Sequence, residues 1–200
     1  MTGFTVVFLM SNLLIALIAE DHTDCDTIRK IVQRVLGTNI GTKKWASNGC
    51  STLKRKLAAK LNVMTSDGCN AFIIVHDLDR NPQNNSLNDE ARLRKILEAS
   101  ASKVERTNKH ICIPIEELEA WFWSDPDVVK HVGRGKGEAT ANPHLIIQPK
   151  EKLIRLSISE SRKPRYSTNM NVKLAEMLNL KLCSDRCPSF KNLLNFLYSL

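Results

Sequence analysis

The fold of this chain is decided by the stretch Leu13-Leu14-Ile15-Ala16-Leu17-Ile18-Ala19, which is followed directly by Glu20-Asp21-His22-Thr23-Asp24. A continuous apolar run without polar alternation is typical of a strand buried on both faces, as in a parallel sheet covered by helices. A second run, Ala71-Phe72-Ile73-Ile74-Val75-His76, ends in the same way, at Asp77-Leu78-Asp79. We therefore expect an α/β fold with acidic residues just beyond two strands of a parallel sheet.

The acidic residues after these two runs point to a cation site. Ligands of parallel sheets bind outside the carboxyl ends of the strands, so Glu20, Asp77 and Asp79 are expected on one rim. Carboxylates crowded together repel one another unless a cation neutralises them. Mg²⁺ is usually held by one or two carboxylates, with water and phosphate completing its shell. The sequence therefore predicts a site for Mg²⁺ or Mn²⁺ at this rim.

Further along the chain, segments typical of helices and strands alternate. Apolar spacing predicts a helix over 24–36, with Thr23 or Asp24 as its cap and Gly37 at its end. The other expected elements are a basic helix at 52–61, a helix at 87–101, a strand at 109–115, a helix beginning near Pro114, and apolar-periodic segments at 172–180 and 190–197. Alternating strands and helices require crossover connections, which again indicates a parallel sheet.

Three regions are expected. Residues 1–9 are interpreted as a leader or a misassigned start, because Met10 immediately precedes Ser11-Asn12-Leu13. Residues 10–130 are expected to form an α/β core with helices on both faces of the sheet. Residues 131–200 are expected to supply a basic loop and C-terminal helices that pack on this core.

Charge and composition indicate the class of partner. The 200 residues carry a net charge of +8, which favours a polyanionic partner. Nine lysines and arginines between Lys130 and Arg165 outnumber three acids, and the segment at 133–137 reads GRGKG. Contact with nucleic-acid or nucleotide phosphates is one interpretation of this segment, and a solvated loop is the other. It lacks the spacing of a P-loop, so P-loop ATPase activity is excluded.

The cysteines and the N-terminal segment bear on localisation. Six scattered cysteines show no zinc-ligand spacing, and they favour reduced thiols in a cytoplasmic protein. No lysine or arginine precedes the apolar N-terminal segment, and no cleavage pattern follows it, so neither a signal peptide nor a membrane span is expected.

Four short motifs together resemble one family. Residues 20–24 resemble the E-G-x-T-D/E element, and 77–79 the D-x-D element, of TOPRIM domains of the OLD nuclease type. The phrases Glu117-Leu118-Glu119-Ala120-Trp121 and Cys187-Pro188-Ser189-Phe190 are similar to small stand-alone TOPRIM-like proteins, which are often encoded beside an ATPase in bacterial defence loci. The core of the resemblance covers residues 13 to about 125, and the remainder resembles the family more loosely, through Pro143 to Lys150, Tyr166 and the final helix. It implies a TOPRIM-like fold and a Mg²⁺-dependent nuclease of DNA or RNA, acting in phage defence with a separate ATPase.

The resemblance also implies a role for each matching acid. Glu20 would bind metal or act as a general acid or base, and Asp77 and Asp79 would hold Mg²⁺. Asp24 lies where OLD-type nucleases place an acid near a second metal. The acids beside that region are Glu117 and Glu119. Asp21 departs from the pattern, because it puts a side chain where the family has glycine.

Several assignments stay open at this point. A basic side chain is expected to balance the transition state, and the candidates are Lys150, Lys152, Lys163 and Arg80. Which glutamate of the 116–119 segment faces the metal depends on the phase of the helix, although the i, i+3 rule places Glu116 and Glu119 on one face. Whether the chain forms a homo-oligomer is also open.

Each functional interpretation has a structural alternative. Asp77 and Asp79 could form a turn and cap the next segment, and the three glutamates could be a solvated helix face. Trp121, Phe122 and Trp123 are expected to anchor the core or a partner surface rather than to stack on bases. The alternative function is a non-catalytic TOPRIM-like module that binds nucleic acid, nucleotide or the ATPase.

Overall fold

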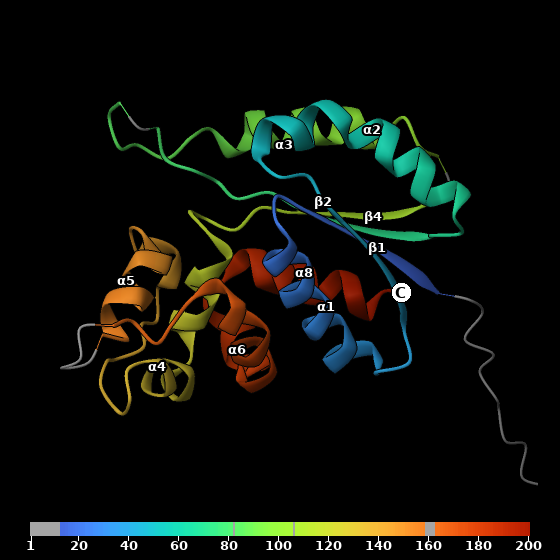
Figure 1. The fold of residues 1–200 in the computed structure, drawn as a ribbon. Coiled ribbons are helices and arrows are strands. Elements are labelled where there is room, and N and C mark those ends of the chain that lie inside the picture. Colours follow the sequence, from blue (N-terminus) through green and yellow to red (C-terminus); the bar gives the residue numbers. More distant parts are fainter. Residues whose placement is uncertain (1–12, 82, 106, 159–162) are drawn as a thin grey trace, which may run out of the picture.

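The computed structural model describes residues 13–81, 83–105, 107–158 and 163–200, and it shows a parallel sheet between layers of helices (Figure 1). The interpretation of residues 1–9 lies outside the described residues. The strands are β1 (Leu14–Ala19), β2 (Gly41–Ala46), β3 (Ala71–Val75) and β4 (Asn108–Cys112), all parallel in the order β2-β1-β3-β4. The expected α/β fold is therefore confirmed.

The order of the strands reverses between β1 and β3. After β1, helix α1 (His22–Leu36) leads to β2 on one side of it. Helix α2 (Cys50–Ser66) then crosses back to β3 on the other side, and α3 (Glu90–Ala101) continues outward to β4. The carboxyl ends of β1 and β3 thus border the topological switch point, where ligands of open α/β sheets bind.

Alternate side chains of the central strands enter two separate cores. Helices α2 and α3 cover one face of the sheet, where the strand residues are Ala16, Ile18, Phe72 and Ile74. Helices α1 and α8 (Pro188–Tyr198) cover the other face, where the strand residues are Ile15, Leu17, Ile73 and Val75. Burial on both faces explains the unbroken apolar runs of β1 and β3.

The chain after β4 is helical and packs against α1. Its elements are η1 (Leu118–Ser124), α4 (Pro126–Val132), η2 (Pro143–Leu145), α5 (Pro149–Leu156), η3 (Thr168–Met170), α6 (Asn171–Met177), α7 (Leu180–Arg186) and α8. Helices α6 and α8 contact α1, and buried residues of the 153–197 region share its core. Figure 1 shows α4, α5 and α6 together beside the carboxyl ends of the strands. We call these three helices the C-terminal lobe.

Two aromatic residues of η1 are buried in this core, as their sequence suggested. Trp121 and Phe122 are both fully buried, and the Trp121 indole N–H donates a hydrogen bond of 3.0 Å to Ser189 Oγ.

All six cysteines are free thiols. Among the described residues, no helix is long and apolar enough to cross a membrane.

Three local expectations were wrong. Strand β2 was not expected, because its segment GTKKWA is half-exposed at the sheet edge and lacks an apolar run. Helix α1 begins at His22, and its cap is Asp21 rather than Thr23 or Asp24. No helix begins near Pro114, because Glu116 has a left-handed φ of 63° and the helical turn starts only at Leu118.

The GRGKG segment is a turn whose two outer glycines approach α5 closely, while Arg134, Gly135 and Lys136 are exposed. Gly137 has a φ of +92°, and a Cβ atom there would lie 2.9 Å from Leu156 Cδ1. A Cβ atom on Gly133 would lie 2.2 Å from the carbonyl oxygen of Lys136. These glycines therefore let the turn fold closely onto α5.

Candidate functional site

Glu20 follows β1 at the switch point, beside a buried histidine. Its Oε1 atom lies 3.2 Å from His76 Nδ1. The same ring nitrogen lies closer, at 2.8 Å, to the carbonyl oxygen of Asp77. Oε1 is buried and has no hydrogen-bond partner among the described residues. Burial and then the negative charge of Asp79 raise the pKa of Glu20 to about 7, although a backbone hydrogen bond from Asp77 opposes this. Glu20 can therefore exchange a proton near neutral pH.

Asp77 belongs to a group of carboxylates near the strand ends, which we call the acidic rim: Glu20, Asp24, Asp77, Asp79 and Glu119. It follows β3, and its Oδ1 atom is buried without a hydrogen-bond partner among the described residues. Burial raises the pKa of Asp77 well above its ordinary value, and the charges of Asp24, Glu119 and Glu20 raise it further. Carboxylates from three separate segments, the end of β1, α1 and η1, therefore act electrostatically on Asp77.

Asp24 comes from the first turn of α1 and is almost fully buried. Burial and then the charges of Asp21 and Glu119 raise its pKa to about 8, while Lys150 lowers it. Asp21 itself accepts hydrogen bonds from the backbone N–H of Asp24 at 2.9 Å and from Thr23 Oγ1 at 2.7 Å. The residue that replaces the family's glycine therefore acts as the N-cap of α1.

Glu119 is held by the C-terminal region. It is 4% exposed, and its Oε1 atom accepts a hydrogen bond of 3.0 Å from Asn171 Nδ2. The hydroxyl of Tyr166 donates to Asn171 Oδ1 at 2.7 Å. Burial raises the pKa of Glu119, and the hydrogen bond from Asn171 opposes that shift. Sequence reasoning did not find Asn171, because its partner is 52 residues away in the chain.

Glu116 and Glu117 turn toward the C-terminal lobe instead. Glu116 pairs with Arg80 and accepts a hydrogen bond of 3.1 Å from the backbone N–H of Gln148. Glu117 binds Lys150 twice, through the backbone N–H at 3.2 Å and through Nζ at 2.5 Å. The three glutamates thus differ in their partners: Glu119 is bound by Asn171, whereas Glu116 and Glu117 fix the start of α5. The charges of both Glu119 and Glu117 raise the pKa of Asp77.

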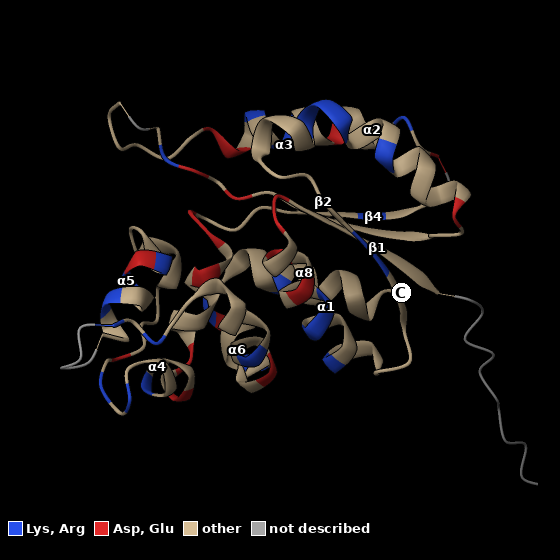
Figure 2. Ribbon diagram, viewed as in Figure 1, with Lys and Arg blue, Asp and Glu red and all other residues tan. Residues whose placement is uncertain are grey.

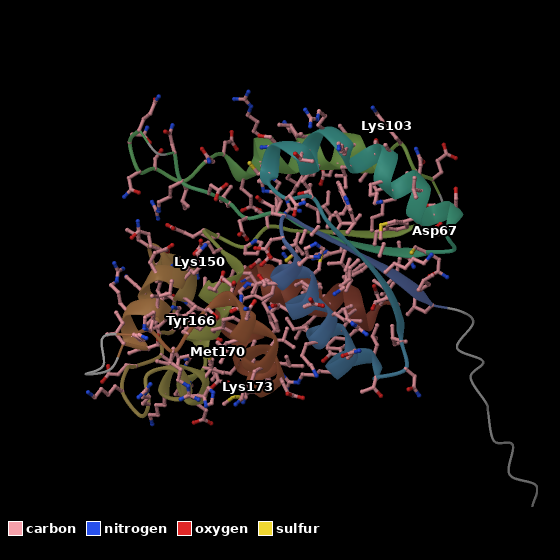
Figure 3. All side chains as sticks on the ribbon, viewed as in Figure 1. Asp67, Lys103, Lys150, Tyr166, Met170 and Lys173 are labelled. Atoms are coloured by element: carbon pink, nitrogen blue, oxygen red, sulfur yellow. The ribbon has the colours of Figure 1, made fainter. Side chains whose placement is uncertain are left out.

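The basic side chains that were candidates for balancing the transition state lie in different surroundings. Lys150 influences the acidic rim, because its charge lowers the pKa of Asp24. Figure 3 shows Lys150 on the side of the C-terminal lobe that faces the sheet, with Tyr166 deeper in the lobe. Arg80 is engaged by Glu116 and by the carbonyl oxygen of Asn85. Lys152 and Lys163 are exposed and form no hydrogen bond or ion pair with a described residue.

A cavity of about 360 Å³ opens beside the acidic rim, between β3 and the first turns of α2 and α3. Asp77 and Asp79 line it, together with two cations that sequence reasoning did not place at the site, Lys54 and Arg92. The charge of Lys54 lowers the pKa values of both Glu20 and His76, so it lies within electrostatic reach of both. The cavity therefore joins carboxylates to basic side chains that suit a phosphate.

The acidic rim offers the oxygen ligands that a hard divalent cation prefers, although these ligands do not enclose a ready binding site. Among the described residues, no three histidine, cysteine, aspartate or glutamate side chains converge in a ready metal site. Mg²⁺ does not need such a cage, because it commonly binds one or two carboxylates and keeps several waters. Two buried oxygens without partners, Asp77 Oδ1 and Glu20 Oε1, are donors of the required kind.

The chain belongs to a family described as "Domain of unknown function (DUF4276)", whose profile matches residues 19–198. The match includes the acidic rim, the cavity residues and the C-terminal lobe. No curated protein and no solved structure shows significant similarity to the chain.

Proposed function

We propose that this DUF4276 protein is a metal-dependent nuclease that hydrolyses phosphodiester bonds at the carboxyl ends of β1 and β3. The single observation that carries the proposal is the state of Asp77. Its buried Oδ1 has no partner among the described residues, and neighbouring carboxylates raise its pKa well above the ordinary value. A buried carboxylate in this state is strained without a cation, and it gains most from binding one.

The residues of the rim supply complementary roles. Asp77 would hold the cation together with Glu20 or Asp24, and the chemistry such a cation supplies is activation of water and stabilisation of charge on phosphate. Where Asp24 rather than Glu20 joins Asp77 at the cation, Glu20, with a pKa of about 7, is suited to accept the proton of the attacking water. Lys150 is positioned by Glu117 and compensates negative charge near Asp24. Glu119 is positioned by Asn171.

The wider setting rests on the resemblance to TOPRIM-like nucleases. We propose that the protein acts in the cytoplasm as the effector of a phage-defence system, with a separate ATPase as its partner. The alternative, a non-catalytic module, is favoured by one observation: no three metal-ligating side chains of the described residues converge. The raised pKa values favour the nuclease, because simple binding of a polyanion gives no reason to bury repelling carboxylates at its contact surface.

Cleavage assays test this proposal. Purified protein is incubated with DNA, RNA and tRNA in Mg²⁺ or Mn²⁺, with and without a neighbouring ATPase, and compared with Asp77→Asn. We expect the wild type to cut at least one substrate and Asp77→Asn to lose about 100-fold or more of that rate. Asp67→Asn is the matched control, since Asp67 pairs with Lys43 at the other end of the sheet (Figure 3). Failure of the wild type on every substrate, or equal rates for Asp77→Asn, would contradict the proposal.

A further inference from the structure

The helices on one face of the sheet carry basic side chains that have no ion-pair partner. Helix α2 contains no acidic residue, and α2 packs against α3. Lys54 and Arg55 of α2, with Arg92 and Lys95 of α3, form no ion pair with a described residue. We call these four side chains the α2–α3 basic surface. Figure 2 shows lysines and arginines on both helices, above the acidic segments that follow the strands.

The α2–α3 basic surface is continuous with the cavity. Lys54 and Arg92 line the cavity beside Asp77 and Asp79, whereas Arg55 and Lys95 are exposed on the same helices. Asp89 also lines it, but its carboxylate is used as the N-cap of α3, where it accepts a hydrogen bond of 3.0 Å from the Arg92 N–H. Basic side chains thus lead from the outer face of the helices to the acidic rim.

The basic residues of the C-terminal lobe and of the segments that connect its helices do not belong to the α2–α3 basic surface. Lys150 is bound by Glu117, and Arg165 donates to the carbonyl oxygen of His131. The turn at 133–137 packs onto α5. Figure 2 shows this turn at the outer edge of the lobe, away from the acidic segments at the strand ends. Among the described residues between 130 and 165, no lysine or arginine lines the cavity.

We propose that the substrate is a polynucleotide whose phosphate backbone lies across the α2–α3 basic surface, with Lys54 and Arg92 contacting phosphates next to the one at the acidic rim. This inference rests on the proposed function. Arg55 and Lys95 lie outside the cavity, so a mononucleotide held in the cavity would leave them unused, whereas a chain of successive phosphates can contact them as well. Contact through phosphates fixes the position of the chain but reads no sequence.

Binding without catalysis tests the proposal. Fluorescence anisotropy with labelled 30-nucleotide single-stranded DNA and RNA is measured in EDTA, so that no cleavage is required. We expect Lys54→Gln/Arg92→Gln to raise the Kd at least tenfold. We also expect the slope of log K against log salt to become shallower by about 1.4, since each phosphate contact with a single strand contributes about 0.7. The two probes together show whether DNA or RNA binds more tightly.

Arg134→Gln/Lys136→Gln is the matched control, because it removes the same charge from the turn of the C-terminal lobe. We expect its Kd to stay within twofold of the wild type. Three results would overturn the proposal: no binding of either probe by the wild type, equal Kd values for both double variants, or a larger loss in the control. Absence of cleavage with selective weakening by Lys54→Gln/Arg92→Gln would instead contradict the proposed nuclease while leaving this binding surface intact.

Discussion

Asn171 donates a hydrogen bond of 3.0 Å from Nδ2 to Glu119 Oε1, and both side chains are buried. This contact joins the first residue of α6 to η1, which follows the sheet. The C-terminal region is therefore more than a cover for α1. It sets the position of a carboxylate whose charge raises the pKa values of Asp24 and Asp77.

The contact between Asn171 and Glu119 predicts a loss of stability when it is removed. Asn171→Leu removes the 3.0 Å donor of a buried carboxylate and leaves it the longer contact of 3.4 Å from the Tyr166 hydroxyl, so we expect the free energy of unfolding to fall by about 1.5–3 kcal/mol. Urea unfolding measures this loss. Tyr166→Phe is the milder comparison, because it removes a hydroxyl that donates to Asn171 Oδ1 at 2.7 Å and reaches Glu119 Oε1 only at 3.4 Å, and about 1 kcal/mol is expected. A wild-type midpoint for Asn171→Leu would show that the contact contributes nothing.

Two glycines of the 133–137 turn provide a second, matched comparison. Gly135 and Gly137 both have positive φ values, +87° and +92°, but only Gly137 faces Leu156 within 3 Å. Alanine should therefore destabilise at both positions through backbone strain, by about 1 kcal/mol. We expect a further loss of about 1–3 kcal/mol for Gly137→Ala alone, because the added methyl group overpacks against α5. Equal midpoints in urea for the two variants would argue against the packed turn.

The acidic rim predicts an unusual dependence of stability on pH in the absence of metal. Folding raises the pKa of Glu20 from 4.5 to about 7 and that of Asp24 from 3.8 to about 8. At Glu20 and Asp24 the folded chain therefore binds more protons than the unfolded chain between these values, so the contribution of these two groups to stability falls as the pH rises from about 4 to above 8. Thermal unfolding in EDTA across this range measures the effect. We expect Asp24→Asn to flatten the profile.

The lowered pKa of His110 predicts a separate effect of acidic pH on stability. Burial, and then the charge of Arg94, lower its pKa from 6.5 to about 4. At this ring the unfolded chain therefore binds a proton at higher pH than the folded chain, and the contribution of His110 to stability falls as the pH drops from 6.5 toward 4. His110→Phe should remove this loss and keep the ring stack on Phe196, whose centroid lies 5.2 Å away. The same acid-side loss in His110→Phe would show that another group is responsible.

The central strands were predictable because burial on both faces leaves a local signature. The apolar runs of β1 and β3 are visible without knowledge of their neighbours, and the acids after them follow from the geometry of parallel sheets. Strand β2 was missed because an edge strand with Lys43 and Lys44 half-exposed carries no such run. Its pairing with β1 is a tertiary property.

The candidate site was predictable to a similar extent. Glu20, Asp24 and Asp77 are adjacent to strand ends or to a helix start, so topology alone brings them together. The orientations of Glu117 and Glu119 were not predictable, because they depend on a left-handed φ at Glu116 and on partners far along the chain. Lys54 and Arg92 were missed as site residues because the cavity forms only when α2 packs against α3.

The most direct test of the account is the binding of Mn²⁺ to the acidic rim at pH 8, measured by isothermal titration calorimetry. The wild type and Asp67→Asn should each bind at least one Mn²⁺ per chain, whereas Asp77→Asn should bind it at least tenfold more weakly. Asp67 is an exposed carboxylate paired with Lys43, so its variant controls for the loss of one charge. No Mn²⁺ binding by the wild type, or equal binding by wild type and Asp77→Asn, would contradict the assignment of Asp77 as the centre of a metal site.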